Sequence, residues 1–136
     1  MQISDNGIRF IETNEGFSAT VYGDVGHSAI GYGHDLLPGE SFPMGVTEAQ
    51  AEALLTEDVG KVEAALNPLI PATCTQNQFD ALCDFGYNLG CGALKTMLAH
   101  GWDQVPEQML RWDFVDGQPN AGVEARRAAE AQLFNT

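Results

Sequence analysis

The sequence predicts an α+β fold in which a small antiparallel β part lies at one edge of a mainly helical body. Apolar residues recur at helical spacing over most of the chain, and only residues 17–32 show the residue types of a sheet. The 136 residues contain no internal repeat and no low-complexity linker. We therefore expect a single domain, with an N-terminal helix and β lobe at 1–46, a helical body at 47–136, and a cleft between sheet and helices.

The first predicted helix is followed directly by the β part. Ser4 or Asp5 can cap the helix, and Gly16 is placed to end it just after Glu15. Aromatic and β-branched residues punctuated by glycines then fill residues 17–32, which predicts short antiparallel strands with tight turns. This stretch is the only β signal that we find, so Glu15 is expected where helix meets sheet.

The remainder of the chain is predicted to be helical. Thr47 and Gln50 form a capping box that opens a helix of about 20 residues, which Pro68 ends. Thr75 caps a second strong helix over residues 76–87, and its broad apolar surface indicates a central, buried element. Shorter helices are predicted around residues 92–99, 104–112 and 123–134, broken by Gly101 and by a turn at residues 116–119.

Charge and composition exclude several classes of protein. Six Lys and Arg residues face nineteen Asp and Glu residues, and a net charge of −13 repels nucleic acid and anionic lipid. No apolar run approaches the roughly 20 residues that cross a bilayer, and the N-terminus has no secretory signal pattern, so we expect no membrane insertion. Cys74, Cys83 and Cys91 are expected to be reduced thiols, although one loop-to-helix disulfide is an alternative.

Glu15 and Asp24 flank a short aromatic strand and are the candidate catalytic pair. Glycoside hydrolysis needs one protonated carboxyl that donates to the leaving oxygen and one ionised carboxylate. Glu15 at a helix end beside Phe17 would be desolvated, which raises the pKa of a carboxyl, whereas Asp24 in a glycine-flanked turn would stay ionised. The alternative is that they are an ordinary helix-end residue and an ordinary turn residue.

The motifs EGF, Y-x-D and IGYGH resemble those of the phage-type lysozymes, the endolysins of tailed phages in glycoside hydrolase family 24. The resemblance extends through TEAQAEALLTEDV, TQNQFDALCDFGYNLG and RRAAEAQLF, in the family's order. It implies a lysozyme-like α+β fold and cleavage of the β-1,4 bond between N-acetylmuramic acid and N-acetylglucosamine in peptidoglycan. It also implies Glu15 as the general acid, Asp24 as the acid that holds the hydrolytic water, and no cofactor or metal.

The sequence departs from the family pattern just before IGYGH. The family has a third catalytic residue there, a threonine, and this chain has Ala29. The segment after Asp24 is also about one residue shorter than the common pattern, so the hydroxyl of Ser28 could hold the water in its place or could simply support the turn. We therefore predict Ser28 as the third candidate catalytic residue.

Further site residues follow from the resemblance. It places Arg126 near the catalytic glutamate, where it would lower the pKa that burial raises; a solvated ion pair on the last helix is the alternative. The predicted substrate-binding residues are Tyr32, Tyr87, Asn88 and Arg126. His34 is expected to be a structural hydrogen-bonding residue and His27 an exposed turn residue, while Trp102 and Trp112 could stack on sugars or pack in the core.

The resulting hypothesis is a monomeric muramidase that binds bacterial peptidoglycan and cleaves it with inversion. It is expected to accumulate in the host cytoplasm and to act on the wall once the membrane is breached. Two alternatives stay open at this point. One is a peptidoglycan-binding module with weak or no turnover, suggested by Ala29, and the other is a lytic transglycosylase, which needs no positioned water.

Overall fold

The computed structural model describes residues 1–24 and 27–136, without the side chain of Asp24. It confirms the predicted α+β class. Six α-helices make up the body: α1 (Asp5–Glu15), α2 (Glu48–Leu66), α3 (Gln76–Leu89), α4 (Cys91–Leu98), α5 (Val105–Leu110) and α6 (Ala121–Phe134). Two 3₁₀ turns, η1 (Asn67–Leu69) and η2 (Trp102–Gln104), follow α2 and α4.

Four of the predicted helix ends are confirmed by their caps, whereas the helix predicted at 76–87 ends at Leu89 and the one predicted at 104–112 covers only Val105–Leu110. The Ser4 hydroxyl accepts a hydrogen bond from the Gly7 amide at 3.1 Å and so begins α1. Gly16 ends the same helix with φ of 71°, a conformation that costs glycine little. Complete capping boxes begin α2 at Thr47 and α3 at Thr75.

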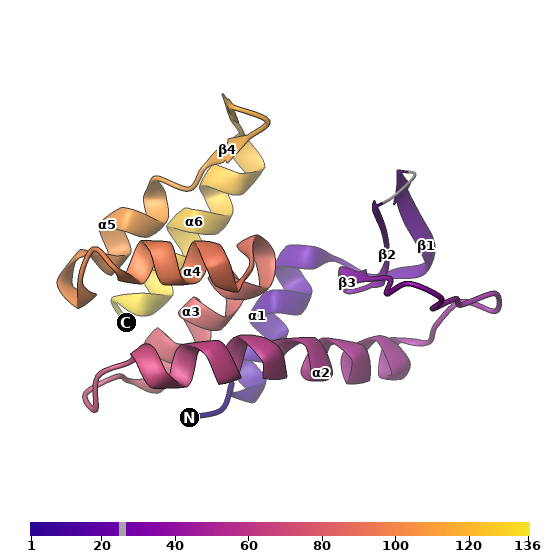
Figure 1. Cartoon of the computed structure of the whole chain (residues 1–136), viewed down its shortest axis with the longest axis horizontal. Coiled ribbons are helices and arrows are strands. Elements are labelled where there is room, and N and C mark those ends of the chain that lie inside the picture. The colour runs from indigo at the N-terminus through magenta and orange to yellow at the C-terminus, as the bar shows by residue number, and fades with distance from the viewer. Residues whose placement is uncertain (25–26) are drawn as a thin grey trace.

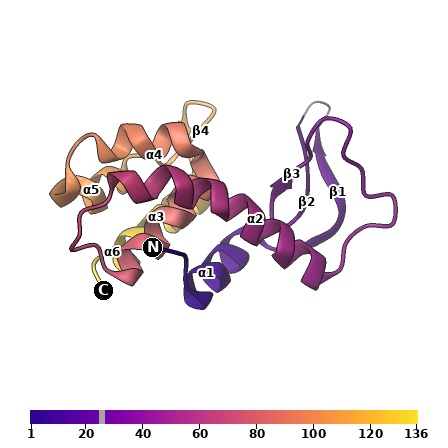
Figure 2. The same cartoon turned by 60° about the horizontal axis from the view of Figure 1, so that its bottom comes forward.

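The predicted strands form a three-stranded antiparallel sheet in the order β1 (Ser18–Asp24), β2 (His27–Gly31) and β3 (His34–Asp35). Figure 1 shows this sheet standing apart from the helical bundle as a separate lobe. In both Figure 1 and Figure 2, α2 runs from the lobe along the length of the body. Ala51 and Leu54 near the start of α2 pack in a small core with Ile30 and Val46, whereas the apolar residues of α2 from Leu55 to Leu66 pack in the main core.

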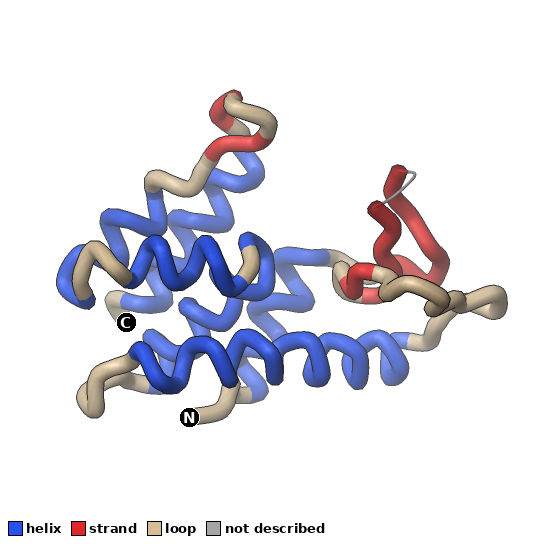
Figure 3. Tube along the Cα trace, viewed as in Figure 1, coloured by secondary structure: helices blue, strands red, loops and turns tan. Residues whose placement is uncertain are grey.

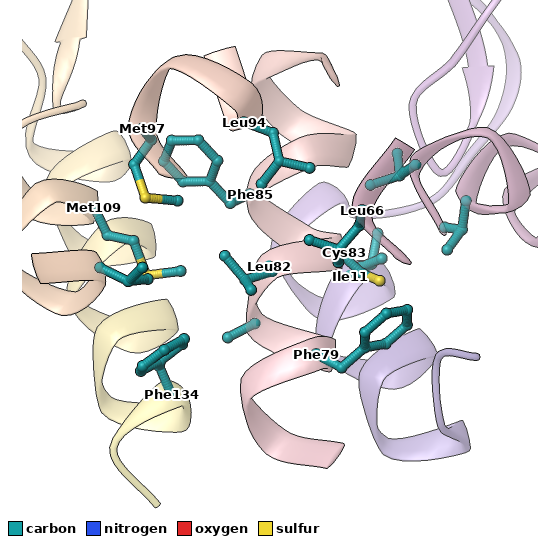
Figure 4. Packing of buried hydrophobic residues seen from close by; sticks show 14 of the residues in the cluster. Ile11, Leu66, Phe79, Leu82, Cys83, Phe85, Leu94, Met97, Met109 and Phe134 are labelled. Carbon is teal, nitrogen blue, oxygen red and sulfur yellow. The ribbon is translucent and has the colours of Figure 1, made fainter. Parts of the chain in front are cut away.

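Helix α3 is the central element of the body, as predicted. Every residue from Phe79 to Gly86 is buried, and α3 packs against α1, α2, α4 and α6. Figure 4 shows its apolar side chains meeting those of the surrounding helices, including Ile11, Leu66, Leu94, Met97, Met109 and Phe134. Because Ile11 lies in this core, α1 packs in the helical body although the sequence division at residue 46 grouped it with the β lobe.

The expectation that residues 17–32 hold the only strands is wrong. A second hairpin joins β4 (Phe114–Val115) to β5 (Gln118–Pro119), and Figure 3 shows it where α6 begins, away from the main sheet. Asp116 and Gly117 have φ of 50° and 78°. An Asp-Gly pair with two positive φ values is the favoured two-residue hairpin turn, so the residues predicted as a turn also pair the strands beside it.

Both tryptophans pack against core aromatic rings. Trp112 meets Phe85 edge to face at 5.8 Å between ring centroids, and Trp102 lies 5.2 Å from Phe134. The three thiols are unpaired, with Cys83 fully buried. Within the described residues, none of the helices has the length and hydropathy to cross a membrane.

Candidate active site

Glu15, the last residue of α1, lies between the β lobe and the helical body. Its side chain is 17% exposed, and its Oε1 lies 2.8 Å from Nη1 of Arg126 on α6. Gly16 ends the helix immediately afterwards, so the chain turns into β1 from this point. The sequence position that drew attention to Glu15, a helix end beside the sheet, is therefore also its position in space.

A cavity of about 230 Å³, which we call the Glu15 pocket, opens beside this carboxyl. Each strand of the lobe contributes to it, together with α3 on the other side. Its lining comprises Glu15, Tyr22, Gly23, His27, Ala29, Gly33, Asp35, Tyr87 and Asn88. Two further cavities adjoin it: one of about 420 Å³ shares Asn88, and one of about 310 Å³ shares Gly33, Asp35 and Tyr87. The first of these lies on the helical body and the second lies between lobe and body, so the hollowed surface extends beyond the Glu15 pocket, as an extended ligand requires.

The surroundings of Glu15 keep its carboxyl protonated to a higher pH than the carboxyl of an exposed glutamate. Burial raises the pKa of the Glu15 carboxyl, and the nearby carboxylates of Asp84 and Asp35 raise it further. Arg126 opposes them by charge and by a hydrogen bond, but the balance leaves the pKa above its ordinary value. A carboxyl held in this way can donate a proton at a pH where a solvated one could not.

Gly33 and Tyr87 form the wall against which Glu15 rests. A Cβ added to Gly33 would lie 2.7 Å from Glu15 Oε2, so only glycine lets the backbone come this close, and its φ is 81°. The Tyr87 hydroxyl donates a 2.6 Å hydrogen bond to the carbonyl of Tyr32 and thereby ties α3 to the lobe. Tyr32 itself is half-buried against Phe17, outside the residues that line the pocket.

The structure describes the side chain of only one of the two candidates for holding the hydrolytic water, Ser28. The backbone of Asp24 pairs with that of His27, a pocket residue, at the end of the β1–β2 hairpin, but the Asp24 side chain lies outside the described residues. Ser28 is not brought to the pocket: His27 and Ala29 line it, and successive residues of a strand face opposite sides of the sheet. Ala29 instead presents a methyl group where a hydroxyl was expected from the resemblance.

Arg126 and Asn88 serve protein contacts as well as lining cavities. The Arg126 side chain is 10% exposed, and its nitrogens contact Glu15 and Asp84. Asn88 is exposed, and its Oδ1 accepts a 2.8 Å hydrogen bond from the buried Arg127. Both residues thus belong to a network of charged and hydrogen-bonded side chains next to the Glu15 pocket. Their predicted part in substrate binding stays a prediction.

The sequence predicted Arg126 beside Glu15 but not the buried acids that share this network. Asp84 on α3 accepts two hydrogen bonds from Arg126, and Glu130 on α6 accepts one from Arg127 at 2.6 Å; both carboxylates have no exposed surface. Burial raises the pKa of Glu130, and Asp84 raises it further. A signal existed: two acids, Asp80 and Asp84, lie one turn apart in the helix that the sequence predicts to be central and buried, which indicates buried charged partners.

The two histidines near the site have structural surroundings. His34 is buried, with Nδ1 at 2.6 Å from Asp58 and Nε2 at 2.7 Å from Glu40, which confirms its expected hydrogen-bonding role. His27 is exposed, 4.0 Å from Asp35. In the described part of the chain, no cluster of three or more His, Cys, Asp or Glu residues has the arrangement of a metal site.

Comparison with known proteins extends over nearly the whole chain. The family model described as "Phage lysozyme" matches residues 12–130. The endolysin of Bacillus phage PZA is 36% identical over 148 aligned residues, which span 100% of this chain and 56% of that protein. The chain thus spans about half the length of the Bacillus phage endolysins that it matches.

Two solved structures share the fold. The endolysin from Escherichia coli O157:H7 phage FAHEc1 superposes with a TM-score of 0.82 at 34% identity, covering 98% of this chain and 93% of that one. The muramidase domain of SpmX from Asticaccaulis excentricus gives a TM-score of 0.84 at 32% identity, covering 99% and 98%. The likeness includes both the β lobe and the helical body.

Proposed function

The chain belongs to the phage lysozyme family, and from this premise we propose that it is a peptidoglycan muramidase of the endolysin type. It hydrolyses the β-1,4 bond between N-acetylmuramic acid and N-acetylglucosamine. One observation carries the proposal: a largely buried glutamic acid, held by a single arginine, faces a pocket between two lobes. That is the environment a carboxyl needs to act as a proton donor.

In this mechanism Glu15 donates its proton to the glycosidic oxygen as the bond to the leaving sugar breaks. The raised pKa keeps the proton on Glu15 to a higher pH than on an exposed glutamate, and the ion pair with Arg126 stabilises the carboxylate that remains. Positive charge develops on the sugar ring as the bond breaks. The acidic surroundings of the pocket, including Asp35 in its lining, favour that charge.

Water attack from the opposite side of the ring is assigned to Asp24, and it inverts the anomeric centre. Support for this role is the position of Asp24 in the β1–β2 hairpin, paired with the pocket residue His27. Ser28 lies on the other face of β2, so we assign it a part in supporting the turn. The methyl group of Ala29 leaves Asp24 with less help in orienting the water, which predicts a modest turnover number.

The enzyme is proposed to act on bacterial peptidoglycan as a monomer and to need no cofactor. It accumulates in the host cytoplasm and meets the cell wall after the membrane is breached. The matches to phage endolysins along the full length of this chain support this course of events. Ala29 favours one second candidate, a lytic transglycosylase, since that reaction uses an internal hydroxyl of the sugar instead of water.

The first test is the loss of turbidity of purified peptidoglycan sacculi. Wild type should clear the suspension, and Glu15→Gln should slow clearing by about 10²–10⁴-fold, because the amide keeps the shape but cannot donate the proton. Glu12→Gln is the matched control: Glu12 lies one turn earlier on α1 and lines a different groove. It should clear at the wild-type rate.

Product analysis separates the two reaction types. Hydrolysis creates free reducing ends, whereas transglycosylation leaves 1,6-anhydromuramic acid. Clearing with anhydro products would replace hydrolysis by transglycosylation at the same site. A wild type that binds sacculi without clearing them, or a Glu15→Gln variant as active as wild type, contradicts the proposal.

A further inference from the structure

Asp84 is a buried acid that lies outside the Glu15 pocket yet touches the residue that holds Glu15. It is on α3, one turn before Asn88, and its side chain has no exposed surface. An ionised carboxylate in such a place is costly unless it is paired and hydrogen-bonded. Its hydrogen-bonding partner is Arg126, which meets it with two nitrogens.

The geometry of this pair fixes the direction of the third nitrogen. Nε donates to Asp84 Oδ2 at 3.0 Å and Nη2 donates to Oδ1 at 2.8 Å, a bidentate contact. The guanidinium is planar and rigid, so two bonds to one carboxylate set the orientation of the whole group. Nη1 is then the arm that remains, and it lies 2.8 Å from Glu15 Oε1.

We propose that Asp84 is a positioning residue for the reaction: by holding Arg126 in one orientation and offsetting its charge, it fixes the Glu15 carboxyl without depriving it of its proton. The inference rests on the proposed role of Glu15 as the general acid. Without Asp84, Arg126 would still face Glu15 but would present an uncompensated positive charge. Glu15 would then ionise at lower pH, and its carboxylate would be held less firmly.

The charged and titratable groups around Glu15 come from every element that packs against it. Arg126 is the positive group at hydrogen-bond distance, and the other titratable groups are Tyr22 on β1, His27 on β2, Asp35 on β3, and Asp84 and Tyr87 on α3. Asp35 is exposed, so solvent screens its effect. Asp84 is buried and acts in a region of low dielectric constant, where a charge has greater reach.

Glu130 does not take the place of Asp84 in this arrangement. Its Oε1 is 3.9 Å from Nε of Arg126, beyond a hydrogen bond, and 2.6 Å from Nη2 of Arg127. Burial and the neighbouring Asp84 raise the pKa of Glu130, and burial lowers the pKa of Arg127, so Glu130 contacts Asp84 as well as Arg127 but does not hydrogen-bond to Arg126. Asp84 is therefore the acid that orients Arg126.

The test measures the ionisation of Glu15 directly, by NMR titration of ¹³C-labelled glutamate carboxyls with Glu15→Gln to assign the signal. Asp84→Asn should move the Glu15 midpoint to lower pH, because the offsetting charge is gone. Asp80→Asn is the matched control: Asp80 is an equally buried acid one turn earlier on α3, bonded to Ser4 and Gln76. It should leave the midpoint in place even if it lowers stability.

Activity provides the second readout. The upper limb of the pH profile for sacculus clearing should shift to lower pH in Asp84→Asn, with about a tenfold loss of rate at neutral pH, and should stay in place in Asp80→Asn. An unmoved Glu15 midpoint in Asp84→Asn overturns the inference whether or not the enzyme clears sacculi. If the wild type clears no sacculi but its Glu15 midpoint still moves to lower pH on Asp84→Asn, the result contradicts the proposed function and leaves the inference intact.

Hydrogen exchange in the wild type and in Glu15→Gln tests the inference even if Asp84→Asn does not fold. The Nε proton of Arg126 should exchange slowly with solvent, and equally slowly in Glu15→Gln, because Asp84 holds it independently of Glu15. Fast exchange, or exchange that becomes fast when Glu15 is replaced, shows that Asp84 does not fix the guanidinium and overturns the inference.

Discussion

At the scale of single residues, Gly33 shows how closely the β lobe is fitted to the carboxyl of Glu15. Its backbone passes Glu15 at a distance that leaves no room for a methyl group: an added Cβ would lie 2.7 Å from Oε2 and 3.2 Å from Cδ of Glu15. It would also lie 3.7 Å from the Tyr87 hydroxyl. The glycine therefore has two separate reasons to be there, its φ of 81° and this contact.

The two reasons can be separated by a matched pair of variants. Gly33→Ala and Gly39→Ala both place a side chain at φ of 81°, but nothing lies within 4 Å of a Cβ at Gly39. Both should lose about 1–2 kcal/mol of unfolding free energy from the strained backbone. Only Gly33→Ala displaces Glu15, and a displacement of that kind lowers the clearing rate by about 10²-fold.

The measurements are urea unfolding and sacculus clearing on both variants. Equal activity of Gly33→Ala and Gly39→Ala would show that Glu15 adjusts freely, and that the close approach of Gly33 has no part in placing it.

The residues of the site differ in how much of their position the sequence predicts. Local signals, a glycine-terminated helix and a glycine-rich sheet, place Glu15 where helix meets sheet, but only the family resemblance favours it over an ordinary helix-end residue. Ser28 could not be distinguished from Ala29, because which face of β2 meets the pocket depends on strand register, and one residue of slip exchanges the faces. Asp84 could be flagged as a buried acid, but its partner is 42 residues away on α6.

At the scale of elements, His34 joins three segments that are separate in the sequence. From β3 it contacts Asp58 on α2 through Nδ1 and Glu40 in the following loop through Nε2. With a carboxylate on each nitrogen, the ring is best satisfied when both nitrogens carry protons. Burial lowers the pKa of His34, but the hydrogen bonds and charges of the two carboxylates outweigh it and leave the pKa raised. The hydrogen bonds to His34 and to the Leu37 amide lower the pKa of Glu40.

These shifts predict how the attachment of the lobe depends on pH. A raised histidine pKa gives stability that is fully present below the unfolded value of 6.5 and is lost as pH rises through the folded value. The lowered pKa of Glu40 gives stability that is present above 4.5 and is lost as pH falls through the folded value. The contribution of His34 to the free energy of unfolding should therefore be largest between about pH 4.5 and 6.5.

Asp58→Asn tests this, with the exposed neighbour Glu57→Gln as a control of equal charge change. Urea unfolding should show a larger loss for Asp58→Asn at pH 5.5 than at pH 9, and a small, nearly constant difference for Glu57→Gln. A loss for Asp58→Asn that is the same at both pH values would mean that the imidazole is neutral in the folded protein.

The elements themselves were predictable where their ends carry their own signals. Thr47, Thr75 and Gly16 begin or end helices through contacts within four residues, so local sequence suffices. The β4–β5 hairpin was missed because each strand has two residues, too short for alternation to show. Its existence depends on positive φ at both Asp116 and Gly117, which the sequence permits but does not require.

At the scale of the whole molecule, two cores and one connecting helix determine where the site forms. The lobe has a small core around Ile30, Val46 and Ala51, and the body has a large one around α3. Because α2 contributes to both, the lobe is held at a fixed position beside the body. The class of fold followed from element order, but the depth of the pocket depends on packing between distant elements, which no local pattern encodes.

The net charge of −13 acts on the approach of the whole enzyme to its proposed substrate. Bacterial walls that carry anionic polymers repel such a protein, and the repulsion reaches about 30 Å at 10 mM salt but only about 10 Å at 100 mM. Clearing of intact walls should therefore become faster between these two concentrations. Sacculi stripped of their anionic polymers are the control and should show little change, since the β-1,4 bond itself is uncharged. Clearing of intact walls that only slows as salt rises would mean that some local attraction, and not the overall charge, governs the encounter.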